Sequence, residues 1–342
     1  MSANPRRVLI VKLSAIGDVL HTVPTAVALR RALPESEIAW AVEGRAGDLL
    51  QGHPAVDRVI GLPRRWLTSA SHVLDIRKTL HEFHADVSID AQGLLKSSVL
   101  SWLSGAGMRI GYAAPEAREG ASLFYTHRVL PTAAHVVDRH LELLAPLGIT
   151  PGTPRFGMPR PAEERRTVEN WWKTLALPDA PAVINPGAGW MSKLWPPERF
   201  ASVARNLGRR HGLVSLVVWG GPSEREAAEK IVAASQGDAV LAPSTTLAEL
   251  AEVIARARVF LSSDTGPLHL AAAIGTPCVG LFGPVPASRN GPYGPQHITV
   301  EPPAELRPAW KDRKRDTHSM LAIDADRVTA AVSQLIRRVA AA

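Results

Sequence analysis

Cysteine is almost absent from this sequence, because Cys278 is the only one among 342 residues. A single thiol cannot form a disulfide within the chain, nor can it supply a metal site built from several cysteines. Cys278 lies in the apolar stretch TPCVGLF. We therefore expect it to be a buried thiol with a structural role.

Long apolar runs are absent as well. No run reaches the roughly 18 residues that a membrane-spanning helix needs. The apolar run after Arg7 is about five residues long and ends at Lys12, which is too short for a signal peptide. Hydrophobic residues make up 46% of the chain and charged residues 21%, as in folded enzymes. We expect a cytoplasmic protein, and its length predicts two domains.

Aromatic residues are scarce, at 5% of the chain with three Tyr and six Phe. The 39 Lys and Arg residues exceed the 32 Asp and Glu residues by seven. Such an excess indicates an anionic partner: nucleic acid, an anionic membrane surface or a phosphorylated substrate. Proteins that bind single-stranded nucleic acid stack its bases on aromatic side chains. Because this chain has few of them, we expect no nucleic-acid partner.

Several short motifs of known chemistry are also missing. The patterns G-x-G-x-x-G, G-x-x-x-x-G-K-[ST] and G-x-S-x-G do not follow any strand-like run. His81 and His84 are three residues apart, not four as in the zinc motif H-E-x-x-H. Asp324 and Asp326 have the D-x-D spacing of metal-dependent sugar transferases, but they open a predicted helix, where Asp acts as a cap. We therefore expect no metal and no cofactor.

Strand-like and helix-like segments alternate along the chain. Strands are expected at 7–12, 38–42, 57–62, 86–91, 108–112, 182–185, 213–219, near 239, 259–264 and 278–282. Helices are expected at 18–33, 72–84, 95–104, 135–147, 161–175, 197–211, 222–235, 246–256, 267–274 and 324–340. This alternation predicts parallel sheets covered on both faces.

The alternation is interrupted once, at residues 147–164, which are rich in proline and glycine as linkers are. We therefore expect an α/β protein of two Rossmann-like, doubly wound domains, the first over 1–155 and the second over 156–322. In such sheets ligands bind beyond the carboxyl ends of the strands. A linker of this composition predicts a hinge between the two domains.

The segment KLSAIGDVLHTVP joins the first predicted strand to the first helix. Gly17 allows the turn to approach a ligand closely. Asp18 follows at the expected helix N-terminus, where it has two interpretations: an N-cap or a general base that faces a cleft. The spacing alone does not choose between them.

The segment FLSSDTGPLHLAAAIGTPCVGLFGP places Asp264, Thr265 and Gly266 between a strand and a helix. Backbone N–H groups at such a helix start can bind a phosphate, and the helix dipole favours the anion. His269 lies on the first turn and can donate to the same phosphates. The alternative is an ordinary turn capped by Asp264, with a surface histidine. Two glycine-marked strand ends side by side favour a binding crevice.

Two further strand ends carry polar residues. NPGAGWMSKLWP has Gly187 directly after a strand, and its Lys193 can neutralise a diphosphate. WGGPSERE contains Glu224, which can bind ribose hydroxyls. The alternatives are a solvated lysine and a glutamate that favours the dipole of its helix. A place on the strand beside the Asp264 loop favours the binding role for Lys193.

The Asp18 and Asp264 segments together resemble glycosyltransferase family nine, the ADP-heptose:lipopolysaccharide heptosyltransferases. IDAQGLLKSS (89–98), REGASLFY (118–125) and SKLWPPERF (192–200) resemble heptosyltransferase I more narrowly. The resemblance runs from about Val8 to about Gly294. It implies a GT-B fold with a central cleft, in which residues 323–342 form a helix that returns to the first domain.

The resemblance also implies an inverting, metal-independent transfer of L-glycero-D-manno-heptose from ADP-heptose to a Kdo sugar of lipid A. ADP-heptose is then a substrate, and the enzyme works at the cytoplasmic face of the inner membrane, where we expect a monomer. The catalytic base falls on Asp18. The expected donor-binding residues are Gly187, Lys193, Glu224, Asp264, Thr265, Gly266 and His269. The expected acceptor-binding residues are Lys12, Arg64, Arg65, Gln92, Lys96 and Arg118.

The sequence departs from the family pattern at two adjacent positions, because close relatives can carry hydroxyl residues where Ala188 and Gly189 stand here. The backbone must then supply that phosphate contact.

Two basic segments suit the acceptor's surroundings. Arg64 and Arg65 beside Trp66 favour phosphates and carboxylates, and the run KDRKR at 311–315 can attract an anionic leaflet. A solvated charged face is the alternative for both, and it is favoured for 311–315.

Three other functions stay open at this point. Transfer to an existing heptose, as in heptosyltransferase II, would use the same donor loop. A nucleotide-sugar epimerase on this fold would consume the donor without an acceptor. A non-catalytic nucleotide-sugar binder would need no carboxylate at position 18.

Overall fold

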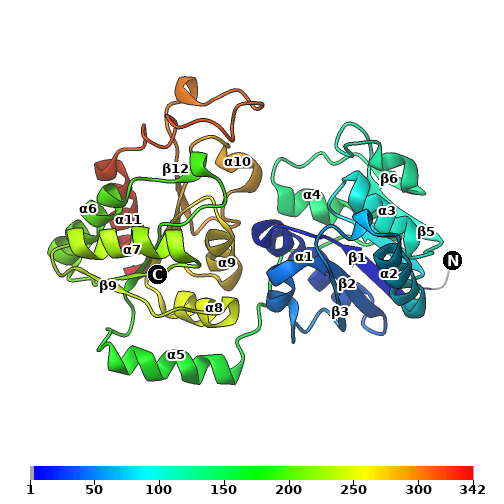
Figure 1. Cartoon of the computed structure of the whole chain (residues 1–342), viewed down its shortest axis with the longest axis horizontal. Coiled ribbons are helices and arrows are strands. Elements are labelled where there is room, and N and C mark those ends of the chain that lie inside the picture. The colour runs from blue at the N-terminus through cyan, green and yellow to red at the C-terminus, as the bar shows by residue number, and fades with distance from the viewer. Residues whose placement is uncertain (1–3, 342) are drawn as a thin grey trace. The chain divides into compact units, whose positions relative to one another are not determined.

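The computed structural model describes residues 4–341 and shows two compact units, which divide between Pro159 and Arg160. The division lies four residues beyond the predicted one at 155 (159 − 155 = 4). Each unit contains a sheet of six parallel strands flanked by helices (Figure 1). The predicted α/β class and its two doubly wound domains are therefore confirmed.

Unit 1 is built on the strand order β3-β2-β1-β4-β5-β6. Its strands are β1 (Arg7–Val11), β2 (Glu37–Glu43), β3 (Arg58–Leu62), β4 (Val87–Asp90), β5 (Met108–Tyr112) and β6 (His127–Val129). Its helices are α1 (Ile16–Ala32), α2 (Ala70–Phe83), α3 (Leu95–Leu103) and α4 (Val136–Glu142), with short 3₁₀ turns η1 (Gly44–Leu50), η2 (Trp66–Thr68), η3 (Ala121–Phe124) and η4 (Ala145–Leu147). Apolar strands such as RVLIV are buried because helices cover both faces of the sheet.

Unit 2 is built on the strand order β12-β11-β10-β7-β8-β9. Its strands are β7 (Ala182–Asn185), β8 (Ser215–Val217), β9 (Ala239–Leu241), β10 (Val259–Ser263), β11 (Cys278–Leu281) and β12 (Ile298–Val300). Its helices are α5 (Ala162–Thr174), α6 (Pro197–His211), α7 (Pro222–Ala234), α8 (Leu247–Arg256), α9 (Gly266–Ile274), α10 (Ala287–Asn290) and α11 (Ala325–Ala340), with 3₁₀ turns η5 (Met191–Lys193) and η6 (Ala304–Leu306).

Both sheets follow the same plan. When the strands are numbered within their own unit, each order reads 3-2-1-4-5-6, the order of dinucleotide-binding sheets. The direction of winding reverses between β1 and β4 in unit 1 and between β7 and β10 in unit 2. Ligands of such sheets bind beyond the carboxyl ends of the two strands at this reversal. The fold therefore indicates one site in each unit.

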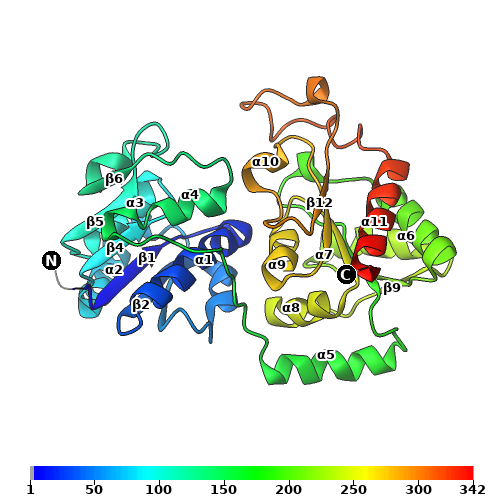
Figure 2. The ribbon, with the colours of Figure 1, turned by 180° about the vertical axis from the view of Figure 1, so that it is seen from behind.

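The last helix, α11, packs on unit 2. Its side chains Val328, Val332 and Leu335 lie in the same buried cluster as residues of β7, β10 and β11, and α11 runs beside α6 in both views (Figures 1 and 2). A hydrogen bond of 2.9 Å joins His211 Nε2 of α6 to Ser333 Oγ of α11. The expectation that residues 323–342 return to the first domain is therefore wrong, because the apolar face of this helix completes the core of unit 2.

No helix within residues 4–341 is long and apolar enough to span a bilayer.

Candidate functional site

The reversal in unit 2 brings together residues that lie far apart in the sequence. Strands β7 and β10 are neighbours, with Ser262 opposite Asn185 in register. The loop after β7 leads to Lys193, and the loop after β10 begins with Asp264. Lys193 lies in η5 (Met191–Lys193), beyond the end of β7 and not on the strand itself, but the prediction that it neighbours the Asp264 loop is confirmed. The carboxyl ends of these two strands form the candidate site.

Asp264 is the buried centre of this site, with 5% of its surface exposed. The Lys193 ammonium donates to its Oδ2 at 2.6 Å, and His269 Nε2 lies 3.1 Å from its Oδ1. Asn290 of α10 donates to both oxygens, at 3.3 and 3.4 Å. Burial alone would raise the pKa of Asp264, but the hydrogen bond with His269 and the charge of Lys193 outweigh it and lower the pKa to about 2. Asp264 is thus an ionised anchor that holds three side chains.

We expect Asp264 to stabilise the fold at neutral pH and to lose that effect in acid. Its pKa falls from 3.8 to about 2 on folding, so its contribution is complete above pH 3.8 and disappears as the pH approaches 2. The shift corresponds to about 2 kcal/mol of unfolding free energy. Denaturant unfolding of the wild type and of Asp264→Asn at several pH values measures it.

Parallel stability curves for the two proteins between pH 5 and pH 2 would contradict this expectation. Asp179→Asn is the matched control, since it removes an exposed carboxylate from the same unit. That variant should follow the wild-type curve throughout.

Helix α9 begins at this site with its N-terminus at the end of β10. Thr265 is its N-cap, and the Thr265 hydroxyl accepts from Leu268 N at 3.4 Å. The alternative in which Asp264 caps the turn is therefore wrong, because the Asp264 carboxylate points to Lys193. Gly266 is the first helical residue, and amides at this position have no acceptor within the helix. The start of α9 can therefore bind an anion.

A buried amide fixes the cap of α9 against β7. Asn185 Nδ2 donates to Ser262 Oγ at 2.9 Å and lies 3.4 Å from Thr265 Oγ1. The Ser262 and Thr265 hydroxyls are 3.0 Å apart. Neither Asn185 nor Asn290 is among the site residues predicted from the sequence. Asn185 is marked by its position as the polar last residue of a buried strand, whereas no sequence signal marks Asn290.

Gly187 and Glu224 form a second contact at this edge of the sheet. A Cβ atom on Gly187 would lie 2.3 Å from Glu224 Cδ and 2.4 Å from its Oε1. Glu224 is half-buried in the first turn of α7, and its Oε2 accepts from Gly220 N at 2.7 Å. The missing side chain at position 187 therefore makes room for the carboxylate of Glu224.

We expect Gly187→Ala to displace the Glu224 carboxylate. If Glu224 holds a ribose, the affinity for ADP should fall about tenfold, the loss of one charge-assisted hydrogen bond, while the affinity for inorganic pyrophosphate stays unchanged. Isothermal titration calorimetry of both ligands measures this. Glu224→Ala should have the same effect, and Gly187→Ala should then add nothing to it. Additive losses in the double variant would show that Gly187 acts in some other way.

Asp18 in unit 1 is exposed and lies in the first turn of α1. It is the third helical residue, and its Oδ2 accepts from the backbone N–H of Ala15 at 3.1 Å. The N-cap position itself belongs to Ala15. Asp18 is therefore oriented by a capping hydrogen bond, and its carboxylate still faces solvent, which is compatible with a role as base.

The predicted acceptor residues gather at the carboxyl edge of the sheet of unit 1. Lys12 follows β1 and is buried, and its ammonium donates a hydrogen bond to Ala91 O at 2.9 Å. Gln92 follows β4, and its Oε1 accepts from Leu13 N at 3.2 Å. These two bonds tie the ends of β1 and β4 together. The buried carboxylate of Asp90, whose pKa burial raises, accepts from Gln92 N at 2.8 Å and shapes this turn.

The other basic residues lie around this edge. Lys96 pairs with Glu43, the last residue of β2, and the Arg64 guanidinium lies 3.8 Å from where a Cβ on Gly44 would stand. Arg118 is exposed, and its N–H donates to Gly93 O at 2.9 Å beside β4. Arg65 is exposed and has a left-handed backbone with φ of 60°.

Two minor expectations are confirmed. Asp324 is the N-cap of α11, and its Oδ1 accepts from Asp326 N at 2.7 Å. Cys278 is fully buried in β11, and burial raises the pKa of its thiol.

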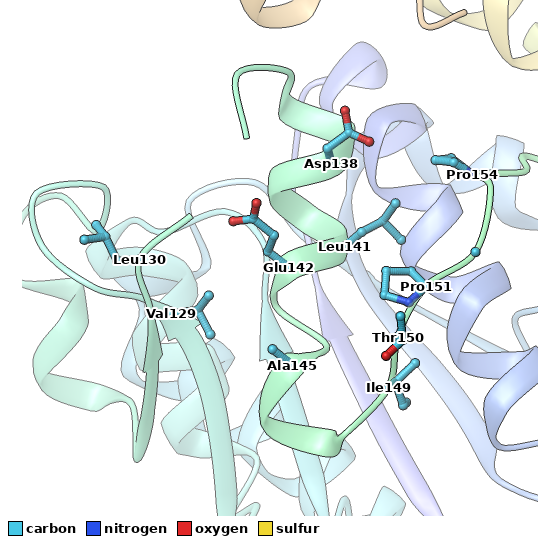
Figure 3. Close-up of a pocket in the computed structure, with 11 residues that line it drawn as sticks. Val129, Leu130, Asp138, Leu141, Glu142, Ala145, Ile149, Thr150, Pro151 and Pro154 are labelled. Carbon is cyan, nitrogen blue, oxygen red and sulfur yellow. The ribbon is translucent and has the colours of Figure 1, made fainter. Parts of the chain in front are cut away.

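A pocket of about 560 Å³ lies elsewhere in unit 1, between the end of β6, helix α4 and residues 149–154 (Figure 3). None of the predicted donor or acceptor residues lines it. Two carboxylates, Asp138 and Glu142, interrupt its apolar lining. Glu142 accepts hydrogen bonds from Thr132 and so belongs to the loop beside it. This pocket is not part of the candidate site.

Comparisons with known proteins cover both units. The family model described as glycosyltransferase family 9 (heptosyltransferase) matches residues 73–318. Lipopolysaccharide heptosyltransferase 1 of Pseudomonas aeruginosa is 35% identical over 307 residues, which cover 85% of this chain and 82% of that protein.

Solved structures are similar over nearly the whole length. E. coli heptosyltransferase WaaC with ADP has a TM-score of 0.78 at 29% identity, covering 96% of this chain and 99% of that one. The same enzyme with ADP-2-deoxy-2-fluoro heptose has a TM-score of 0.75 at 31% identity, covering 97% and 99%.

Proposed function

This chain belongs to glycosyltransferase family 9, and from that membership we propose that it transfers heptose from ADP-heptose to a Kdo residue of lipid A. Two of the relatives it matches, at 35% and 32% identity, are named for heptose transfer in lipopolysaccharide. Heptosyltransferase 1 is the name that recurs among them.

One observation carries the donor part of the proposal. Buried, ionised Asp264 holds the Lys193 ammonium at 2.6 Å beside the N-terminus of α9, at the reversal of the sheet. A cation and a helix N-terminus side by side are suited to a diphosphate. Solved relatives at 29% and 31% identity contain ADP and a fluorinated ADP-heptose, which supports an ADP-sugar as the ligand here.

The proposed reaction is a single displacement with inversion. The acceptor hydroxyl attacks the anomeric carbon, and its proton passes to the Asp18 carboxylate. The bond from the anomeric carbon to the diphosphate oxygen breaks, and ADP leaves with the electron pair. Lys193 and the Gly266 N–H at the start of α9 then face the new negative charge on the β-phosphate.

The same groups explain why we propose a reaction without metal. A metal ion in a sugar transferase neutralises the leaving diphosphate. Here Lys193 supplies the positive charge, and Asp264 fixes its position.

The acceptor part rests on the basic edge of unit 1. Arg64, Arg65 and Arg118 are exposed there, and guanidinium groups pair well with carboxylates and phosphates. A Kdo sugar carries a carboxylate and lipid A carries phosphates. We therefore propose that a monomer meets this glycolipid at the cytoplasmic face of the inner membrane.

An ADP-release assay with purified protein tests the proposal. ADP-heptose should be turned over with Kdo-lipid A, and not without it or with an acceptor that already bears one heptose. Excess EDTA should leave the rate unchanged. Turnover of donor without acceptor would indicate an epimerase or hydrolase, preference for the heptosylated acceptor would indicate the second transfer, and loss of activity in EDTA would refute the metal-free mechanism.

A further inference from the structure

A long segment of unit 2 takes no part in the site described so far. It runs from Glu301 to Asp324, between β12 and α11, and forms the orange arch that extends from the unit in Figure 1. Its centre is the basic run at 311–315, preceded by the exposed Trp310. In the sequence this run has the appearance of a solvated charged face.

The structure divides this run into two kinds of residue. Arg313 and Lys314 approach the indole of Trp190, with Arg313 Cζ at 5.8 Å and Lys314 Nζ at 5.0 Å from the ring centroid. Arg313 also lies 4.0 Å from the centroid of Trp310. For the exposed Lys311 and Arg315, no such ring contact is found within the described chain.

Trp190 connects this pair to the donor groups. The Lys193 ammonium lies 4.4 Å from the centroid of the same ring and 2.6 Å from Asp264 Oδ2. Lys314 Nζ and Lys193 Nζ are therefore at most 9.4 Å apart (4.4 + 5.0 = 9.4). Three cations surround one indole at the edge of the candidate diphosphate site.

Charge indicates what this cluster binds. Like charges no more than about 9 Å apart, as Lys193 and Lys314 are, repel each other by at least about 0.5 kcal/mol and by about 2 kcal/mol in a less polar medium. Contact with an aromatic face offsets only about 0.5 to 1 kcal/mol at an exposed site. Asp264 is the one carboxylate in ion-pair contact with any of the three within residues 4–341. Arg313 Nε is also buried there without a hydrogen-bond acceptor. A bound polyanion would reduce the repulsion among the three cations and would supply an acceptor for Arg313 Nε.

We propose that Arg313 and Lys314 form the second half of a diphosphate-binding site, with Trp190 holding them beside Lys193. The site takes the diphosphate of a nucleotide sugar, which rests on the proposed function for the identity of the ligand. Lys193 and α9 meet this group from the sheet, and the segment between β12 and α11 meets it from outside. Arg313 and Lys314 thereby become donor-affinity residues that the Asp264 loop alone does not reveal.

The test compares two double variants that lose the same charge from the same run. Arg313→Ala with Lys314→Ala removes the pair that contacts Trp190, and Lys311→Ala with Arg315→Ala is the matched control. Calorimetry with ADP, AMP and inorganic pyrophosphate gives the affinities, and thermal unfolding checks that both variants fold. The first variant should weaken ADP and pyrophosphate by about tenfold or more and AMP by less. The control should stay within about twofold for all three ligands.

Each other outcome has a definite meaning. Equal losses in the two double variants would show a general charge effect and overturn the site. Weaker binding to phosphatidylglycerol vesicles with unchanged ADP affinity would assign the pair to a membrane surface and also overturn it. Pyrophosphate binding that depends on Arg313 and Lys314, in a protein that does not bind ADP, would keep the site and refute the proposed donor. Failure of the wild type to bind either ligand would refute both.

Steady-state kinetics supply a second readout. Arg313 and Lys314 are proposed to contact the donor and not the acceptor. Their loss should therefore raise KM for ADP-heptose and leave KM for the acceptor unchanged. Trp190→Leu should produce part of the same change, because it keeps the charges but removes the ring that positions them. A change confined to the acceptor KM would contradict the assignment.

Discussion

Asp18→Asn should lower the transfer rate by about a thousandfold, within the range of 10² to 10⁴ that general base catalysis contributes, while ADP binds as it does to the wild type. The variant removes the proton acceptor and little else. An asparagine oxygen can still accept from Ala15 N, so the hydrogen bond that orients residue 18 at the start of α1 is kept. Single-turnover rates with ADP-heptose and acceptor, together with ADP calorimetry, measure both effects.

Controls separate loss of the base from loss of charge. Asp75→Asn removes another exposed carboxylate from unit 1, in α2, and should leave the rate unchanged. Thermal unfolding of Asp18→Asn should match that of the wild type. Transfer at close to the wild-type rate in this variant would remove Asp18 from the mechanism and leave it as part of the capping interaction of α1.

Lys193→Ala should lower kcat/KM by about 10² to 10³, the usual cost of removing one group that stabilises the charge of a transition state. It should also weaken ADP binding, because Lys193 is the one cation of the three around Trp190 that pairs with Asp264, the residue before the N-cap of α9, within the described residues. The variant has a second effect on the fold. It leaves Asp264 buried with one positive partner fewer, so the unfolding free energy should fall as well.

A double variant separates these two effects. Asp264→Asn combined with Lys193→Ala removes both members of the pair, so it should recover stability relative to Lys193→Ala alone. If Lys193 acts on the diphosphate, activity and ADP affinity stay low in the double variant. Recovery of activity together with stability would mean that Lys193 only supports the loop, and its role as a donor ligand would be refuted.

Most of the fold can be predicted from the sequence because its strands are buried on both faces. A run such as AVIN or VFLSS begins with three apolar residues and ends in polar ones, which marks both the strand and its carboxyl end. Strands β6 and β12 were not predicted, because each has only three residues and these include polar ones, HRV and ITV. The edge strand β9 is equally short, but its residues AVL are all apolar. The sequence also did not predict correctly which unit α11 packs on. The periodic apolar face of this helix indicates that it packs against a sheet, but it does not indicate which sheet.

Some residues of the candidate site can likewise be predicted from the sequence, and others cannot. Asp264, Lys193 and Gly187 can be predicted, since each follows a strand and strand ends converge in a parallel sheet. The sequence does not predict that Gly187 makes room for Glu224, because these two residues meet only through tertiary packing. The same holds for the basic run at 311–315. Its residues are equivalent in the sequence, and only contact with Trp190 distinguishes Lys314 from Lys311.

The packing of α11 on unit 2 has a consequence for biosynthesis. Each unit is one continuous stretch of chain with its own core, so unit 1 is complete once Pro159 has left the ribosome. The following 183 residues (342 − 159 = 183) take about 10 to 40 s to translate at ordinary rates. During that interval unit 1 can fold alone. If α11 packed on unit 1, that unit could not be completed before α11 had been translated, whereas here a stop codon before α11 removes core residues from unit 2 only.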